Sequence, residues 1–247
     1  MRIALLSDVH EDIINLQLAL DKISRLQCDE VICLGDISGY SATHHDYLTS
    51  RNARECLKLL REHCQLIIPG NHDLHAVYRT PKFSGFEYPS KWYDMDYWQR
   101  TELSKGQVWL YEHDELDPLY TNEDNDFLFH LQEMSIKKYG ERNILFSHYL
   151  YPNLTGSEQV FYHNPAEFNG HRGFMNRLGA QISFAGHRHF GGVMINSGKS
   201  LVTKGLGKVV AVKDGDIIHV PAITRAASNS GFMIFDDEIM TVQGYKI

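Results

Sequence analysis

The stretch Ile3-Ala4-Leu5-Leu6-Ser7-Asp8-Val9-His10 is a short apolar run that ends in a small residue, an aspartate and, two positions later, a histidine. An apolar run of about four residues predicts a strand covered on both faces. A small residue at its end lets the backbone turn sharply and approach an ion or a phosphate closely. The stretch therefore predicts a buried strand that delivers two metal-capable side chains, Asp8 and His10.

The same arrangement recurs four more times along the chain, in Val31–Asp36, Leu66–His72, Ile144–His148 and Ile182–His189. Open α/β sheets place their sites at the carboxyl ends of such strands. One turn of this kind is weak evidence, because Asp is common in turns and a lone histidine often packs in a core. Five of them together indicate a metal site at the strand ends.

The chain has 247 residues, of which 43% are hydrophobic and 22% charged, with no internal repeat and no Gly/Ser linker. These values are typical of a globular protein, and we expect a single domain over residues 1–247. There is no cationic leader and no apolar run of about 20 residues, so we expect a cytoplasmic protein without a membrane partner. The four cysteines form no C-x-x-C pair, which is typical of reduced thiols. The oligomeric state is not indicated.

The net charge of −7, with no Lys/Arg-rich stretch, disfavours a nucleic-acid groove, because binding by counterion release needs a basic stripe. An acidic protein can still attract phosphate locally if divalent ions supply the positive charge.

The first part of the chain predicts a βαβαβ unit. Helical spacing of apolar residues indicates a helix from about Asp12, a fair N-cap, to Leu26, and a second helix from Ala53 to Cys64. Further helices are predicted over 98–116 and 124–133, the latter introduced by a capping-box-like start at Thr121.

The second half of the chain is predicted to be rich in strands. Met134–Tyr139 and Asn143–Phe146 form a predicted hairpin. Short strands are predicted at 181–184, 193–196, 208–212, 216–220, 232–235 and 239–242. We expect two sheets that meet at the site, with helices outside.

An aromatic-rich insertion is expected at about 78–133. Eight aromatic residues fall between Tyr78 and Trp98, without a regular period. The segment is either a lid that stacks on an organic group of the substrate or an irregular insertion that packs its own small core. We favour the packing interpretation.

Five blocks, in order, resemble the calcineurin-like metallophosphoesterases: Asp8-Val9-His10, Gly35-Asp36, Gly70-Asn71-His72-Asp73, Ser147-His148 and Gly186-His187-Arg188-His189. The segment Gly35–Tyr40 looks like the small bacterial phosphodiesterase branch. The resemblance implies an α/β fold, a four-layer α-β-β-α sandwich with two mixed sheets and a dinuclear metal site at the strand carboxyl ends.

The resemblance also implies the ligands of each ion. One ion would be held by Asp8, His10, Asp36 and His189. The other would be held by Asp36, Asn71, His148 and His187, so that Asp36 bridges. Imidazole and carboxylate ligands without a thiolate suit manganese, iron or zinc, and do not select one of them.

This site predicts hydrolysis of a small phosphodiester or phosphomonoester. Two divalent ions and two carboxylates leave a positive site, where a hydroxide that bridges the ions can attack the phosphoryl group. His72 is not needed as a ligand, and we predict that it stabilises the pentacoordinate charge or protonates the leaving alkoxide. The alternatives are a nuclease acting on single strands and, less favoured, a non-catalytic scaffold of the same fold.

Some positions depart from the pattern or match no block. Larger protein-phosphatase relatives orient the histidine equivalent to His72 with an aspartate where this chain has Gly39. Asp73 and Asp46 are the open candidates for that role. We interpret Glu11 as a helix-entry residue. His44 and His45 are either solvated loop residues, which we favour, or residues that line the mouth of the site. Arg172 and Arg188 are either surface arginines, which we favour, or partners of a phosphate group.

Overall fold

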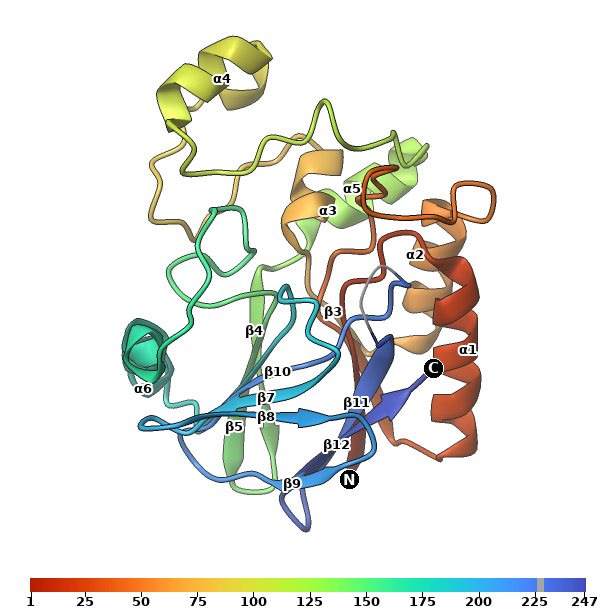
Figure 1. Cartoon of the computed structure of the whole chain (residues 1–247), viewed down its shortest axis with the longest axis vertical. Coiled ribbons are helices and arrows are strands. Elements are labelled where there is room, and N and C mark those ends of the chain that lie inside the picture. Colours follow the sequence, from red (N-terminus) through yellow and green to blue (C-terminus); the bar gives the residue numbers. More distant parts are fainter. Residues whose placement is uncertain (226–228) are drawn as a thin grey trace.

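Two six-stranded mixed sheets pack face to face, with helices α1 and α2 outside one sheet and α6 outside the other (Figure 1). The computed structural model describes residues 1–225 and 229–247. The predicted four-layer α-β-β-α sandwich is confirmed. No helix within the described residues is both long and apolar enough to cross a bilayer.

The first sheet has the strand order β3-β2-β1-β11-β12-β9. Its parallel part is the predicted βαβαβ unit, and the antiparallel part comes from the end of the chain. The bounds are β1 Arg2–Leu6, β2 Glu30–Cys33, β3 Leu66–Ile67, β9 Val209–Ala211, β11 Gly231–Asp236 and β12 Thr241–Lys246.

The second sheet has the order β4-β5-β6-β10-β7-β8, in which β5, β6 and β10 are parallel. The predicted hairpin is confirmed as β4 paired with β5. The edge strand β8 was not predicted, because its side chains are mostly exposed and show no apolar pattern. The bounds are β4 Met134–Tyr139, β5 Arg142–Ser147, β6 Ile182–Ala185, β7 Gly192–Asn196, β8 Leu201–Gly205 and β10 Ile217–His219.

The inner strands, such as β1 and β6, are buried on both faces, which explains their uninterrupted apolar runs. Leu5 of β1 and Phe184 of β6 lie in the core between the sheets. The neighbouring Ala4 packs with Leu16 and Leu57 beneath the helices of the first sheet. A third core lies beneath α6 and includes Leu145, Phe174 and Met175.

The first helices form as predicted. Helix α1 spans Ile13–Arg25, and the Asp12 side chain accepts a hydrogen bond from the N–H of Asn15 at 3.2 Å. Helix α5 begins after Thr121, whose side chain caps the N–H of Asp124. The bounds of α5 are Asn122–His130, and those of the other helices are α2 Ala53–His63, α3 Asn71–Ala76, α4 Tyr97–Ser104 and α6 Asn169–Leu178. Short 3₁₀ turns lie at Trp92–Asp94 and Pro165–Phe168.

The predicted helix over 98–116 was wrong beyond Ser104, where α4 ends. Lys105 has φ 49° and Gly106 has φ 76°, so both lie in the left-handed region, which terminates a helix. The chain then runs as an irregular segment to α5. This segment is important for the site described below.

The aromatic residues of the insertion pack mainly against one another. The rings of Phe86, Tyr88 and Trp92 are in mutual edge contact, with centroids 4.9–5.7 Å apart. The Arg100 guanidinium of α4 lies 5.9 Å from the centroid of Trp92. These contacts favour the packing interpretation of the Tyr78–Trp98 segment.

Candidate metal centre

The turns that follow β1 and β2 are hydrogen-bonded to each other. The N–H of Asp8 donates to Gly35 O, and the N–H of His10 donates to Asp36 O, each at 2.9 Å. Asn71 follows β3 as the first residue of α3. Because β1, β2 and β3 are parallel, these side chains arise at the same edge of the first sheet.

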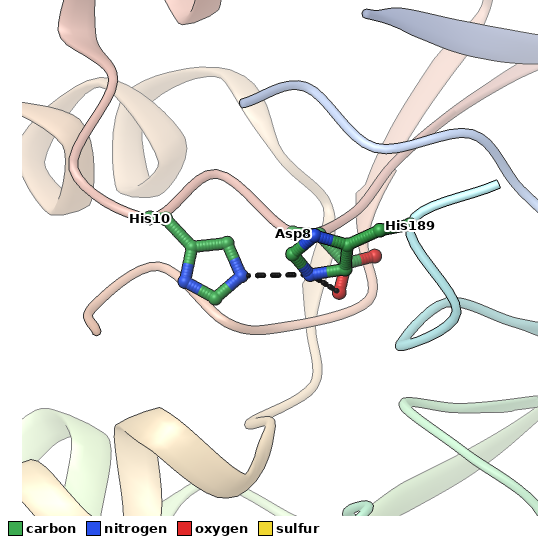
Figure 2. Close-up of side chains that lie close together, drawn as sticks. All are labelled: Asp8, His10 and His189. Atoms are coloured by element: carbon green, nitrogen blue, oxygen red, sulfur yellow. Dashed lines mark hydrogen bonds and ion pairs between the residues drawn. The ribbon is translucent and has the colours of Figure 1, made fainter. Parts of the chain in front are cut away.

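The second sheet brings three histidines to the same edge, His148 after β5 and His187 and His189 after β6. The Nε2 atom of His189 lies 3.2 Å from Asp8 Oδ1 and 3.0 Å from His10 Nε2 (Figure 2). The two sheets therefore complete one site together, although His10 and His189 are 179 positions apart in the sequence.

Three overlapping groups of side chains among the described residues could hold a metal ion, with all ligand atoms of a group within 4.8 Å of one another. They are Asp8/His10/His189, Asp36/His148/His187 and His10/Asp36/His72. Asn71 lies beside His187 of the second group. Both side chains contact Gly156, because a Cβ atom added to this glycine would lie 2.5 Å from His187 Nδ1 and 2.8 Å from Asn71 Oδ1.

Backbone contacts set the protonation of two imidazoles. The Nδ1 atoms of His10 and His148 face the carbonyl oxygens of Gly39 and Leu34, at 3.1 and 2.6 Å. A carbonyl only accepts, so both Nδ1 atoms donate, and Nε2 of each ring faces the site. The Nε2 atom of His148 lies 3.0 Å from Asp36 Oδ2. A proton on Nε2 binds this carboxylate in the metal-free protein, and a metal ion held by both groups would replace that proton.

Two buried side-chain atoms at this site, Asn71 Oδ1 and His187 Nε2, have no hydrogen-bond partner, and two more, Asp36 Oδ2 and His148 Nε2, have only each other. Orphaned buried polar atoms are rare in native proteins, because each costs about 1–3 kcal/mol. An ion is one partner that would satisfy all four, so this donor set fits a transition-metal ion with nitrogen and oxygen ligands.

The electrostatics also favour a cation. Burial alone would raise the pKa of Asp36, but the imidazoles of His148 and His72 outweigh it and hold this pKa well below its usual range. Burial lowers the pKa of His148, yet the Asp36 carboxylate raises it, on balance to about 9. Burial, and then neighbouring imidazoles, keep the pKa values of His10 and His187 well below normal.

Five of the seven predicted ligands have a left-handed backbone, with φ between 46° and 68°: Asp8, His10, Asp36, His187 and His189. Each such non-glycine residue stores about 1–3 kcal/mol of strain, which persists only where the surrounding structure imposes it. The clustering of strain at one point is typical of a functional site.

The glycines before the site residues allow close approaches that no side chain would permit. A Cβ atom at Gly70 would lie 2.0 Å from Asp36 Oδ1, and one at Gly186 would lie 1.7 Å from Ser7 Oγ. The small residues at these strand ends are therefore required by packing around the site itself.

We expect Gly70→Ala to lower the free energy of unfolding by about 1–3 kcal/mol, because the added methyl group overpacks the Asp36 turn. Urea denaturation would measure the change. Gly205→Ala is the matched control, since a Cβ atom there meets nothing within 4 Å. Equal stability of the two variants would contradict this account.

His72 lies on α3 beside the ligand groups. Its Nε2 atom is 3.8 Å from Asp36 Oδ2, and its Nδ1 atom donates to the Glu115 carboxylate. Burial lowers the pKa of His72, but Glu115 and Asp36 raise it, on balance to about 10. Neither sequence candidate takes the orienting position. The Asp73 carboxylate accepts from the backbone N–H groups of Ile37, Ser38 and Gly70, and Asp46 is exposed.

A cavity of about 440 Å³ opens at these side chains. None of the aromatic residues from Tyr78 to Trp98 lines it, which disfavours the lid interpretation. The insertion contributes its later residues instead, Trp109, Leu110, Tyr111, Asp114 and Glu115. The rest of the lining comes from the Gly39–His45 loop, Phe161, Arg188 and the site residues His10, Asp36, Asn71, His72, His187 and His189.

The interpretation of His45 as a solvated loop residue was wrong. Glu11 lies just before α1, as predicted, but it is also fully buried, with its carboxylate 3.0 Å from Arg51 Nη1. His45 is buried, although His44 beside it is exposed. Arg172 is a structural residue that donates to Asn196 Oδ1 at 2.5 Å.

The family model of the calcineurin-like phosphoesterases matches residues 1–191 of this chain. An uncharacterized protein of Methanocaldococcus jannaschii is 37% identical over 71 residues, which span 29% of this chain and only 26% of that relative. The crystal structure of a metallophosphoesterase from Sphaerobacter thermophilus has a TM-score of 0.64 and 20% identity, over 100% of this chain and 88% of that chain.

The crystal structure of a hypothetical protein from Pyrococcus horikoshii has a TM-score of 0.60 and 14% identity, over 100% of this chain and 87% of that chain. At these identities, the likeness to both structures establishes the shared fold. The family match covers more than half of the sequence, including every residue of the candidate site. The chain therefore belongs to the calcineurin-like phosphoesterases, a family of metal-dependent phosphoric ester hydrolases.

Proposed function

We propose that this chain is a dinuclear-metal phosphoesterase that hydrolyses a small phosphodiester or phosphomonoester. One ion would be held by Asp8, His10, Asp36 and His189, and the other by Asp36, Asn71, His148 and His187. Asp36 would be the shared ligand. Manganese, iron and zinc all suit these nitrogen and oxygen donors.

The observation that supports this proposal most strongly is a set of four buried atoms that have no hydrogen-bond partner outside the set. They belong to the four side chains proposed for the second ion. A protein that used these residues only for packing would leave several kcal/mol of desolvation uncompensated.

When bound, two such ions supply Lewis acidity, which activates water at neutral pH and neutralises phosphoryl oxygens. The chain's own residues contribute position and charge. His72 is fixed at Nδ1 by Glu115, so its Nε2–H is free to reach a substrate in the cavity. There it would protonate the leaving oxygen or stabilise charge that develops on the phosphoryl group.

The cavity favours a small ester over a polymer. Arg188 is the one lysine or arginine among the described residues that line it, and the whole chain has a net charge of −7. A strand of nucleic acid needs an extended row of cations. A single phosphate group needs only the charge of the two ions.

The test is a metal analysis of protein purified without chelator, followed by a substrate panel. We expect about two ions per chain and hydrolysis of bis(p-nitrophenyl) phosphate, p-nitrophenyl phosphate or both. Cleavage of a single-stranded oligonucleotide with no cleavage of small esters would favour the nuclease instead. Failure to bind Mn²⁺, Fe²⁺ or Zn²⁺ and to hydrolyse any ester would overturn the proposal.

A further inference from the structure

Asn71 and His72 are adjacent at the start of α3, and the side chain of each is hydrogen-bonded to the same short turn of the insertion, Tyr111–Glu115. Asn71 Nδ2 donates to the hydroxyl of Tyr111 at 2.5 Å, and His72 Nδ1 donates to the carboxylate of Glu115. We propose that Tyr111 and Glu115 are positioning residues that form a clamp, in which Tyr111 aims the Asn71 amide at the metal and Glu115 aims the His72 imidazole at the substrate. This inference rests on the proposed function.

The Tyr111 contact decides which end of the Asn71 amide faces the site. An amide offers a donor NH₂ group and an acceptor oxygen, and only the oxygen can bind a cation. Because Nδ2 is held by Tyr111, Oδ1 points to the other side, where it is buried and has no hydrogen-bond partner. Without the hydroxyl, either end of the amide can face the ion.

The Glu115 contact decides the tautomer and direction of the His72 ring. A carboxylate accepts, so Nδ1 donates and Nε2 is left for the substrate side. The edge of the His72 ring also packs against Gly39, where an added Cβ atom would lie 2.5 Å from Nδ1. No acid can occupy that position without a shift, so the orienting acid comes from the insertion.

Tyr111 and Glu115, the two clamp residues, lie in one hydrogen-bonded turn. The N–H of Glu115 donates to Tyr111 O at 2.9 Å, and the N–H of Leu116 donates to Tyr40 O at 3.0 Å in the loop after β2. Glu115 also forms an isolated antiparallel bridge with Ser41. The turn is therefore held against the same loop that contains Gly39, and the insertion becomes part of the catalytic site rather than a peripheral addition.

Tyr111→Phe and Glu115→Gln separate the two functions of the clamp. For Tyr111→Phe, titration of metal-free protein with Mn²⁺ or Zn²⁺ should show about 10–100-fold weaker binding of one of the two ions. For Glu115→Gln, both ions should stay bound, while kcat falls about 10–100-fold and KM changes little. Glu115→Asp keeps a carboxylate and should recover part of kcat.

Matched controls make the same chemical changes nearby. Tyr93→Phe removes a hydroxyl that donates to Arg79 O, and Asp117→Asn neutralises a carboxylate that accepts from the N–H of Leu119. Both should bind metal and turn over like the wild type. If the controls lose as much as the clamp variants, the effect is general destabilisation and the clamp is wrong.

Wild-type metal affinity and kcat in both Tyr111→Phe and Glu115→Gln would also overturn the clamp, while leaving the proposed function intact. Failure of the proposed function looks different, because the wild-type protein itself would then neither bind the two ions nor hydrolyse an ester.

Discussion

An Asp36→Asn variant should lose turnover and bind less metal than any other single-ligand variant. Asp36 is the ligand proposed for both ions, so the change removes one of only two negative charges that hold them. The substitution is structurally conservative. Asp36 Oδ1 accepts the backbone N–H of His72 at 3.0 Å, and the amide oxygen of asparagine can keep that hydrogen bond.

Metal content and kcat should be compared with those of His189→Ala, which removes one ligand from one ion and should lose less of both. Asp46→Asn neutralises an exposed carboxylate in the loop that contains His45 and serves as the charge control. An Asp36→Asn protein with normal metal content and full activity would rule out the dinuclear site.

A His72→Asn variant should bind both ions and keep its fold while kcat falls by roughly 10²–10⁴, the range for loss of an acid or an electrostatic donor. The backbone N–H at position 72 still donates to Asp36, so the turn is preserved. His130→Asn, at a histidine whose side chain is 70% exposed, is the control.

The leaving group then distinguishes two roles for His72. If His72 is a general acid, the loss should be smaller for nitrophenyl esters than for alkyl esters, because nitrophenolate leaves without protonation. If His72 stabilises charge on the phosphoryl group, both ester types should suffer alike. Release of an ion from His72→Asn would show that His72 is itself a ligand.

The sequence alone determined the strands that lead into the site and the residues that end them. An uninterrupted apolar run followed by a small residue and a carboxylate or imidazole has a local cause, since a strand covered on both faces must end in a polar turn. Parallel strands then bring their carboxyl ends to one edge. That rule alone places Asp8, Asp36 and Asn71 together. The cap of α1 at Asp12 is equally local, because it depends on residues three positions apart.

Only the tertiary structure decided what surrounds those residues. Asp73 is adjacent to His72 in sequence, yet its carboxylate turns back to the backbone N–H groups of Ile37, Ser38 and Gly70. Glu115 is 43 residues away and occupies the position instead. No sequence period relates the two, because an irregular segment takes its place from packing rather than from its own backbone hydrogen bonds.

The same reason explains the failed helix prediction. The apolar pattern over 98–116 continues past Ser104, but Lys105 and Gly106 turn into the left-handed region and end α4. The segment that follows packs on the loop after β2 and presents Tyr111 and Glu115 to the site. Local patterns thus determined which side chains end the strands, whereas long-range packing decided which partners hold them, because such contacts join residues that share no local periodicity.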